Sequence, residues 1–422
     1  MELVRLLTSG DEQHTLRLLW RKLDRSLQIA PRIREPLRAM RRRQHVRRFE
    51  VRLREAANRR SDPYIDVARV FGVPASSIRR HTTLPNYYPA EDPGAVIPGD
   101  WDRDAWPVEE RDYYIQLREA LEGRRPWERT EIYASPVALA QSERCSWRRE
   151  ELLLEARESI RGYQLIYESM KRNGYLTQKE LVARRPSGYK PEQFDEMSVA
   201  VARDGEIQVC QGGHRFAIAK AVGIPVLPVW VAVRHADWCD FRRRLVDLAE
   251  TSGGRLAEPL LHPDLVGIPS SSELPGILER ALDVLPAPPG KLVDIGPGWG
   301  YCAHRCEDLG FDCTVVVDDG GDREIAERLK VASRKGLAVA RRLAEAVPTE
   351  ARLDVVLGLR GFHERLATEE RRRELGAFLA ASRPKVIVGV GAQQDIDFCV
   401  EAASLPNVST WACAGQPMFR LS

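Results

Sequence analysis

The chain has 422 residues, and its 64 Lys and Arg nearly balance 61 Asp and Glu, so the net charge is only +3. This length predicts two or three domains, and a hydrophobic content of 43% excludes a disordered chain. No apolar run approaches the ~20 residues of a membrane-spanning helix, and the first residues lack the apolar core of a secretory signal. The 8 cysteines have no regular spacing, which excludes a disulfide framework. We therefore expect a cytoplasmic protein.

We interpret residues 1–60 as a basic helical arm. Between residues 31 and 60 there are 12 Arg against 3 Glu, a net charge of about +9. Apolar residues recur at steps of three and four from Val46 to Ala56, which predicts an amphipathic helix. We expect nonspecific contact with nucleic acid or another anionic surface through residues 32–60. The alternative is an Arg-laced helix that packs on its own protein or on the second copy of a homodimer.

Composition divides the remaining chain into four segments. Residues 61–135 are rich in Pro, Asp and aromatic rings, which predicts an irregular segment that packs on the next domain. Residues 136–245 predict an α+β domain: a helix, a hairpin at Asp204–Gly205, a Gly-rich turn, a helix and a strand. Residues 246–290 form a Ser/Gly/Pro-rich linker around a short helix. Residues 291–422 alternate strands with helices, as is typical of a doubly wound parallel α/β sheet.

The last segment opens on the turn Leu292-Val293-Asp294-Ile295-Gly296-Pro297-Gly298-Trp299-Gly300. A buried strand leads into three glycines at alternate positions, and a helix follows. Such glycines allow a ligand to approach the backbone and leave the helix amides free to bind it. A dinucleotide fingerprint would need glycine at the next position, where Tyr301 stands.

This spacing resembles motif I of the class I S-adenosylmethionine-dependent methyltransferases. The resemblance covers residues 291–422 and implies a Rossmann-like fold whose turn lies against the amino-acid part of the cofactor. It implies that the cofactor is bound by Asp294, Gly296, Gly298 and Gly300. In the family an acid at the end of the second strand binds the ribose. Val317 stands at the expected position, so Asp318 and Asp319 are the candidates.

His363 follows the predicted fourth strand and is our candidate general base, with a solvated loop histidine as the alternative. Cys302, His304, Cys306 and Cys313 crowd one region and suggest zinc. However, His304 points away from the two cysteines that lie one helical turn apart. We therefore predict buried packing and no metal there. No Asn-Pro-Pro-Tyr signature follows the fourth strand, so a scaffold domain without activity stays open as an alternative.

The central segment carries a second Gly-rich turn, Gln211-Gly212-Gly213-His214-Arg215. Its two glycines free the backbone, the following helix presents amides, and His214 and Arg215 supply charge-assisted donors. These features predict a phosphate site at Gly212, Gly213, His214 and Arg215. The alternative is a turn whose charges serve only local structure.

This turn, its helix and the strand Pro225–Val233 resemble the ParB/sulfiredoxin superfamily. Gly99-Asp100-Trp101-Asp102 and Arg234-His235-Ala236-Asp237-Trp238 match elements of one ParB-like subgroup. The resemblance implies a bound nucleotide, ATP or CTP with Mg. Members with kinase activity have an acid where Gln211 stands, and an amide is no general base. No helix-turn-helix of the partition proteins follows the strand.

These features favour an S-adenosylmethionine-dependent methyltransferase whose ParB-like domain recognises a nucleotide or another phosphorylated small molecule. The sequence does not specify the methyl acceptor. Two alternatives stay open. One is a ParB-like nucleotide-binding or DNA-associated protein with a degenerate methyltransferase domain, and the other is a ParB-like phosphotransferase.

Overall fold

The computed structural model describes residues 48–58, 62–84, 92–142, 149–184, 196–271, 273–296, 298–346, 352–360 and 362–422. The chain divides into two compact units, Met1–Glu55 and Ala56–Ser422. The helix predicted from Val46 to Ala56 is present over residues 48–58, and the rest of the basic arm lies outside the described residues. Within the described ranges, no helix combines the length and the apolar character needed to cross a membrane.

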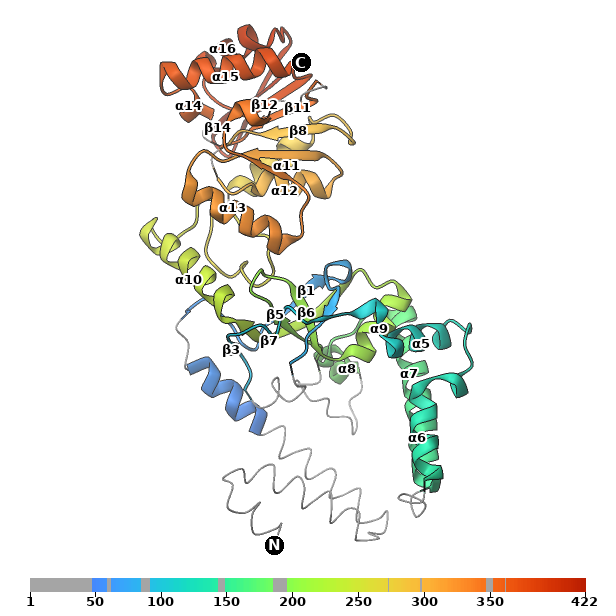
Figure 1. The fold of residues 1–422 in the computed structure, drawn as a ribbon. Helices are drawn as coiled ribbons and strands as arrows, with labels where there is room; N and C mark the ends of the chain where they lie inside the picture. The colour runs from blue at the N-terminus through green and yellow to red at the C-terminus, as the bar shows by residue number, and fades with distance from the viewer. Residues whose placement is uncertain are drawn as a thin grey trace. The chain divides into compact units, whose positions relative to one another are not determined.

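The first half of the larger unit is built on a mixed sheet (Figure 1). The spatial order of its strands is β1 (Val70–Pro74), β7 (Val226–His235), β5 (Ser198–Val201), β6 (Ile207–Gln211), β2 (Arg80–His81) and β4 (Trp106–Pro107), while β3 (Ala95–Ile97) also pairs with β7. The hairpin predicted at Asp204–Gly205 joins β5 to β6 as an antiparallel pair. Strands β1 to β4 come from residues 61–135, so this Pro-rich segment supplies four short strands to the sheet, with β1 and β4 at the two ends of the strand order.

The helices of this half are α5 (Asp112–Leu121), α6 (Glu131–Gln141), α7 (Arg149–Asn173), α8 (Gln178–Arg184), α9 (Gly213–Val222) and α10 (Ala236–Thr251). Helix α9 begins at Gly213, inside the stretch from Gln211 to Arg215 that was predicted as a turn, because Gly212 adopts a left-handed conformation (φ 92°) that ends the strand. Helix α10 was not predicted, and the predicted boundary between residues 245 and 246 lies inside it. His235 caps this helix by accepting a hydrogen bond from the backbone N–H of Asp237.

The second half is a doubly wound sheet of seven strands. Their spatial order is β10 (Ala338–Ala340), β9 (Asp312–Val316), β8 (Lys291–Asp294), β11 (Val355–Gly358), β12 (Val386–Val390), β14 (Gln416–Leu421) and β13 (Val408–Cys413). The first five are parallel and follow the doubly wound order 3-2-1-4-5. Beyond these five strands the sheet carries a hairpin that was not predicted, in which β14 runs antiparallel to both neighbours.

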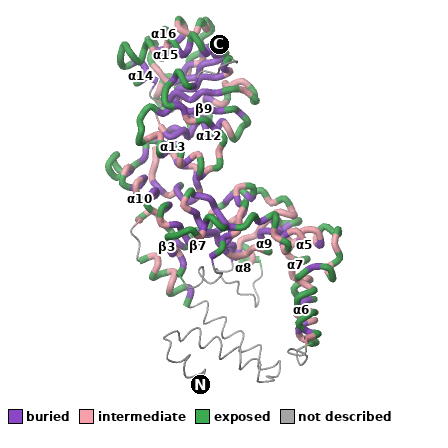
Figure 2. Tube along the Cα trace, viewed as in Figure 1, coloured by how far each residue is buried: buried purple, intermediate pink, exposed green. Residues whose placement is uncertain are grey.

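Helices cover both faces of the second sheet. Helices α11 (Glu273–Leu282), α12 (Tyr301–Asp308) and α13 (Gly320–Ser333) share one core, and α14 (Phe362–Arg365), α15 (Glu369–Ser382) and α16 (Gln393–Ala403) share the other. Successive residues of β11 alternate between these cores: Val355 and Leu357 face the first, and Val356 faces the second. Figure 2 accordingly shows burial concentrated along the strands.

Candidate functional site

The carboxyl ends of β8 and β11 form the first candidate site. The strand order reverses at this point, since β9 lies on one side of β8 and β11 on the other. Ligands of doubly wound proteins bind in the crevice that such a reversal creates. Strand β8 ends at Asp294, and the glycine turn leads directly into the N-terminus of α12.

The turn is packed so closely that Gly296 and Gly298 leave no room for a side chain. A Cβ at Gly296 would lie 3.1 Å from the carbonyl oxygen of Arg360. Gly298 has φ +139°, and a Cβ there would lie 2.9 Å from both carboxyl oxygens of Glu258. Gly300 is the N-cap residue of α12. The glycines predicted from the sequence therefore stand where the backbone approaches other groups.

Asp294 is buried behind the turn and braces it. Its Oδ1 accepts a hydrogen bond from the N–H of Gly296 at 3.1 Å. Burial raises the pKa of Asp294 to about 6, although the hydrogen bonds from the backbone at Gly296 and Ala303 act in the opposite direction. Its carboxyl group therefore holds the turn in shape.

The sequence analysis missed Glu258, which lies in the segment 256–268 between α10 and α11, here called the strap. Glu258 is only 4% exposed. Its carboxyl group accepts hydrogen bonds from the backbone N–H of Trp299 and, at 3.3 Å, from that of Tyr301. Arg360 Nη1 lies 3.9 Å from its Oε2. Burial raises the pKa of Glu258 to about 7, against the opposing influence of these amides and of Arg360.

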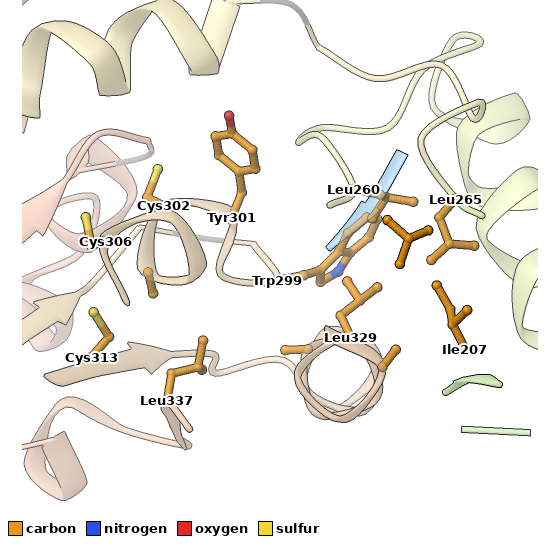
Figure 3. Close-up of a cluster of buried hydrophobic side chains, with 14 of the residues drawn as sticks. Ile207, Leu260, Leu265, Trp299, Tyr301, Cys302, Cys306, Cys313, Leu329 and Leu337 are labelled. Carbon is orange, nitrogen blue, oxygen red and sulfur yellow. The ribbon is translucent and has the colours of Figure 1, made fainter. Parts of the chain in front are cut away.

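The strap also covers the side chains of Trp299, in the turn, and of Tyr301, directly after it. Figure 3 shows the indole of Trp299 beside Leu260 and near Leu329 of α13, all three in the same buried core. The Trp299 Nε1–H donates to Asp322 Oδ1 at 2.8 Å, which fixes the ring against α13. A cavity of ≈ 10 Å³, room for about one water molecule, lies between strap residues 258–261 and residues that include Trp299, Tyr301 and His304.

His304 is 4% exposed, and neither ring nitrogen has a hydrogen-bond partner within the described part of the chain. Burial lowers its pKa to about 4, so the ring is neutral and retains one donor and one acceptor. It lines the same small cavity. Cys302, Cys306 and Cys313 nearby are buried free thiols, and no group of three metal-ligating side chains occurs among the described residues.

The two candidate ribose acids, Asp318 and Asp319, have different environments. Asp319 is the N-cap of α13 and accepts hydrogen bonds at 2.7 and 2.9 Å from the N–H groups of Gly321 and Asp322, which lower its pKa. Asp318 forms an ion pair with Arg365 and its side chain is 44% exposed. Sequence reasoning missed Arg365, whose Nε donates to the Ile295 carbonyl oxygen at 3.0 Å. This buried arginine ties the ends of β8 and β9 together.

His363 lies on the short helix α14, where its side chain is exposed. His363 was expected in the loop after the fourth strand; β11 ends at Gly358 and α14 begins at Phe362, so His363 lies in the first turn of this helix. Phe362, its neighbour, is fully buried against Phe419 with ring centroids 5.6 Å apart, and so anchors α14 to the sheet.

The Gly-rich turn of the first sheet forms a second candidate site at the N-terminus of α9. Gly213 and His214 open this helix. The ring of His214 is stacked on Tyr163 of α7 at 5.0 Å and lies 5.5 Å from Tyr113 of α5. Partial burial lowers the pKa of His214. Arg215, the other predicted cation, lies close enough to Tyr175 to influence that phenol's pKa, which burial raises.

His81 of β2 also approaches this turn, and sequence reasoning missed it. Its Nδ1 is 2.9 Å from the Thr82 carbonyl oxygen, while its Nε2 lies 3.7 Å from the Cβ position of Gly213. The hydroxyl oxygen of Tyr113 would be 2.6 Å from that Cβ, so a side chain at 213 is excluded. Imidazole and phenol groups from four elements therefore surround the amide end of α9.

No model of a known protein family matches this chain, and no curated protein matches it. Solved structures with partial similarity include a TehB-like S-adenosylmethionine-dependent methyltransferase from Corynebacterium glutamicum, 15% identical over 43% of this chain and 96% of that one, with a TM-score of 0.28. The 16S rRNA methyltransferase RsmC of T. thermophilus, in complex with AdoMet and guanosine, is 18% identical over 36% and 43% of the two chains, with a TM-score of 0.31. The 16S rRNA methylase RmtB is 12% identical over 43% and 74%, with a TM-score of 0.30. Similarities this low assign no family.

Proposed function

We propose that residues 291–422 bind S-adenosylmethionine at the turn 296–300 and form the methyl-transferring domain of the protein. The observation that carries this proposal is the pair of backbone amides at Trp299 and Tyr301, which hold a carboxyl group in this structure. The amino-acid part of S-adenosylmethionine ends in a carboxylate, which amides at a helix N-terminus bind well. When bound, this cofactor supplies a methyl group on a sulfonium centre.

The neighbouring residues fit such a ligand. Asp294 braces the turn, and the glycines leave the backbone accessible. Arg360 brings a positive charge to the position of the carboxylate. Asp318 and Asp319 are both candidates for the ribose hydroxyls, because each commits one carboxyl oxygen, to Arg365 and to the cap of α13 respectively, and keeps the other. The unpartnered nitrogens of buried His304 offer a further donor and acceptor beside the turn.

We propose His363 as the general base that takes a proton from the substrate to be methylated. It follows β11, one of the two strands that border the crevice, and its exposed imidazole is free to meet a substrate from solution. Histidine is the side chain that most often acts as a general base in enzymes.

Calorimetry on the full chain with S-adenosylmethionine and its demethylated product tests the proposal. Gly298→Ala should abolish binding, because φ +139° is strained for alanine and its Cβ would occupy the carboxylate position. Gly276→Ala in α11 is the matched control, because a Cβ there meets nothing within 4 Å. Absence of heat at millimolar ligand, in the wild type and in the Glu258 variants described below, would contradict the proposal.

For the first sheet we propose a phosphate-binding role for Gly212, Gly213, His214 and Arg215, with a nucleotide, ATP or CTP with Mg, as the ligand. The observation in favour is the amide end of α9 surrounded by His214 and by ring groups of α5, α7 and β2. Stacking rings suit a base, and the amides suit its phosphates. A DNA-associated role and phosphoryl transfer remain the competing proposals.

Thermal melting in the presence of ATP, CTP and inorganic phosphate, each with Mg, tests this second site. A ligand that binds only the folded chain raises its melting temperature by mass action. Arg215→Ala should remove the increase, whereas Arg157→Ala, an exposed arginine of α7, should retain it. An increase of equal size in Arg215→Ala would place the phosphate elsewhere.

A further inference from the structure

The strap is attached to both sheets of the larger unit. Its ends are closed by hydrogen bonds from Leu256 N to Pro269 O (2.8 Å) and from Ser271 N to Leu256 O (2.9 Å). On the side of the first sheet, His262 Nε2 lies 2.9 Å from the carbonyl oxygen of Gly205. Asp264 forms a buried ion pair at 2.6 Å with Arg234 of β7. The strap therefore has a firm attachment outside the glycine turn.

Near the second sheet, the strap contacts the glycine turn through the carboxyl group of Glu258. Two backbone amides and Arg360 face that carboxyl group, and Gly298 leaves the space that it fills. These contacts are what a free carboxylate ligand would need at a helix N-terminus. A side chain of the protein itself thus holds the position that the proposed function gives to the cofactor.

The space beside the turn is small while the strap lies there. The cavity between strap residues 258–261 and Trp299 measures ≈ 10 Å³, whereas pockets for cofactor-sized ligands measure about 300–1,000 Å³. Leu260 packs against the same buried core as Trp299, so its displacement would open the region next to the turn. Binding of a large ligand at the turn therefore requires residues 258–261 to move.

We infer that Glu258 is a tethered competitor: it occupies the carboxylate position of the glycine turn, and a ligand with its own carboxylate binds only by displacing Glu258 together with residues 258–261. The identity of that ligand as S-adenosylmethionine rests on the proposed function, but the exchange of one carboxyl group for another does not. Because a tethered group competes at a high effective concentration, it weakens the apparent affinity of a free ligand.

Chemical rescue tests the exchange without the cofactor. Glu258→Ala removes the carboxyl group, and acetate supplies one of matching size. We expect acetate, compared with chloride at equal ionic strength, to raise the melting temperature of Glu258→Ala by several degrees more than that of the wild type. Glu250→Ala, an exposed glutamate of α10, is the control and should behave as the wild type. No acetate-specific increase in the variant overturns the inference.

Glu258→Gln keeps the volume of the side chain and so leaves no room for acetate; if Glu258→Ala does not fold, it serves in the following titration, where its neutral amide should compete more weakly than the carboxylate. Titration with S-adenosylmethionine is the second arm, and the Glu258 variants should bind it at least tenfold more tightly than the wild type. Equal affinity in both overturns the inference while the proposed function stands. Acetate rescue without any binding of S-adenosylmethionine supports the inference and contradicts the proposed function.

Discussion

The stability of the second half should depend on pH through Glu258. Burial raises the pKa of this carboxyl group from its ordinary 4.5 to about 7 in the folded chain. The folded state then holds the proton more tightly than the unfolded state does, so the favourable contribution is complete below pH 4.5 and is lost as the pH rises through 7. Glu258→Gln has no proton to lose at this position. The variant should therefore gain stability relative to the wild type as the pH rises.

The size of this effect follows from the two pKa values. The gap between 4.5 and about 7 corresponds to about 3 kcal/mol at 1.36 kcal/mol per pH unit. Most of it, about 2–3 kcal/mol, falls between pH 5 and pH 8. Asp294, whose pKa burial also raises, is present in both proteins, so its contribution largely cancels in the difference.

Urea unfolding of the wild type and Glu258→Gln at pH 5 and pH 8 measures this difference. The free energy of unfolding of Glu258→Gln minus that of the wild type should rise by about 2–3 kcal/mol over this range. Glu250→Gln, with an exposed carboxyl group, should show no such rise. A difference that stays constant to within about 0.5 kcal/mol, or falls with pH, would refute the burial of Glu258 against the turn.

Three further perturbations have definite expected outcomes. Asp264→Asn leaves Arg234 buried without its partner charge and should cost about 3–5 kcal/mol in urea unfolding, and a loss below about 1 kcal/mol would contradict the buried pair. Arg365→Ala removes the bonds to the Ile295 and Val316 carbonyl oxygens and to Asp318. It should lower both stability and affinity for S-adenosylmethionine, and unchanged values for the two would contradict its role at the strand ends. DNA retention through residues 32–60 should fall steeply with salt on scrambled sequences, and tight binding of one sequence at ~200 mM salt would instead favour the DNA-associated alternative.

The glycine turn was predictable from the sequence because its signal is local. The apolar residues Leu292, Val293 and Ile295 mark the buried strand β8 and its end, and the glycines that follow disfavour its continuation. The start of α9 was missed because it depends on the left-handed backbone of Gly212, which residue type alone does not fix. The hairpin of β13 and β14 was missed for a similar reason. Its turn places Ala414 at φ 49° and Gly415 at φ 76°, and alanine lacks the Asn or Asp preference that marks such turns.

The side chains that reach the site from distant segments were less predictable than the glycine turn itself. Glu258 precedes Trp299 by 41 positions in the chain, and the linker pattern around it has no feature that assigns it to the turn. Arg365 is one of many arginines, and only the fold brings it to Ile295 and Asp318. Side chains that reach a site from a distant segment carry no periodic signal, so tertiary packing alone identifies them.

The two acids of the strap differ in a way that decides where it should open. Arg234 and the other donors around Asp264 hold the pKa of that carboxyl group at about 2, so it is charged at neutral pH and its ion pair favours the folded state. Glu258 has the opposite balance, because burial outweighs the amides that bind it and raises its pKa to about 7. Burial penalises the ionised form of both acids, but at Asp264 the charge of Arg234 and the hydrogen bonds outweigh that penalty, whereas at Glu258 the penalty prevails. A ligand that competes for the turn should thus release the strap at Glu258, while Asp264 keeps its other end on the first sheet.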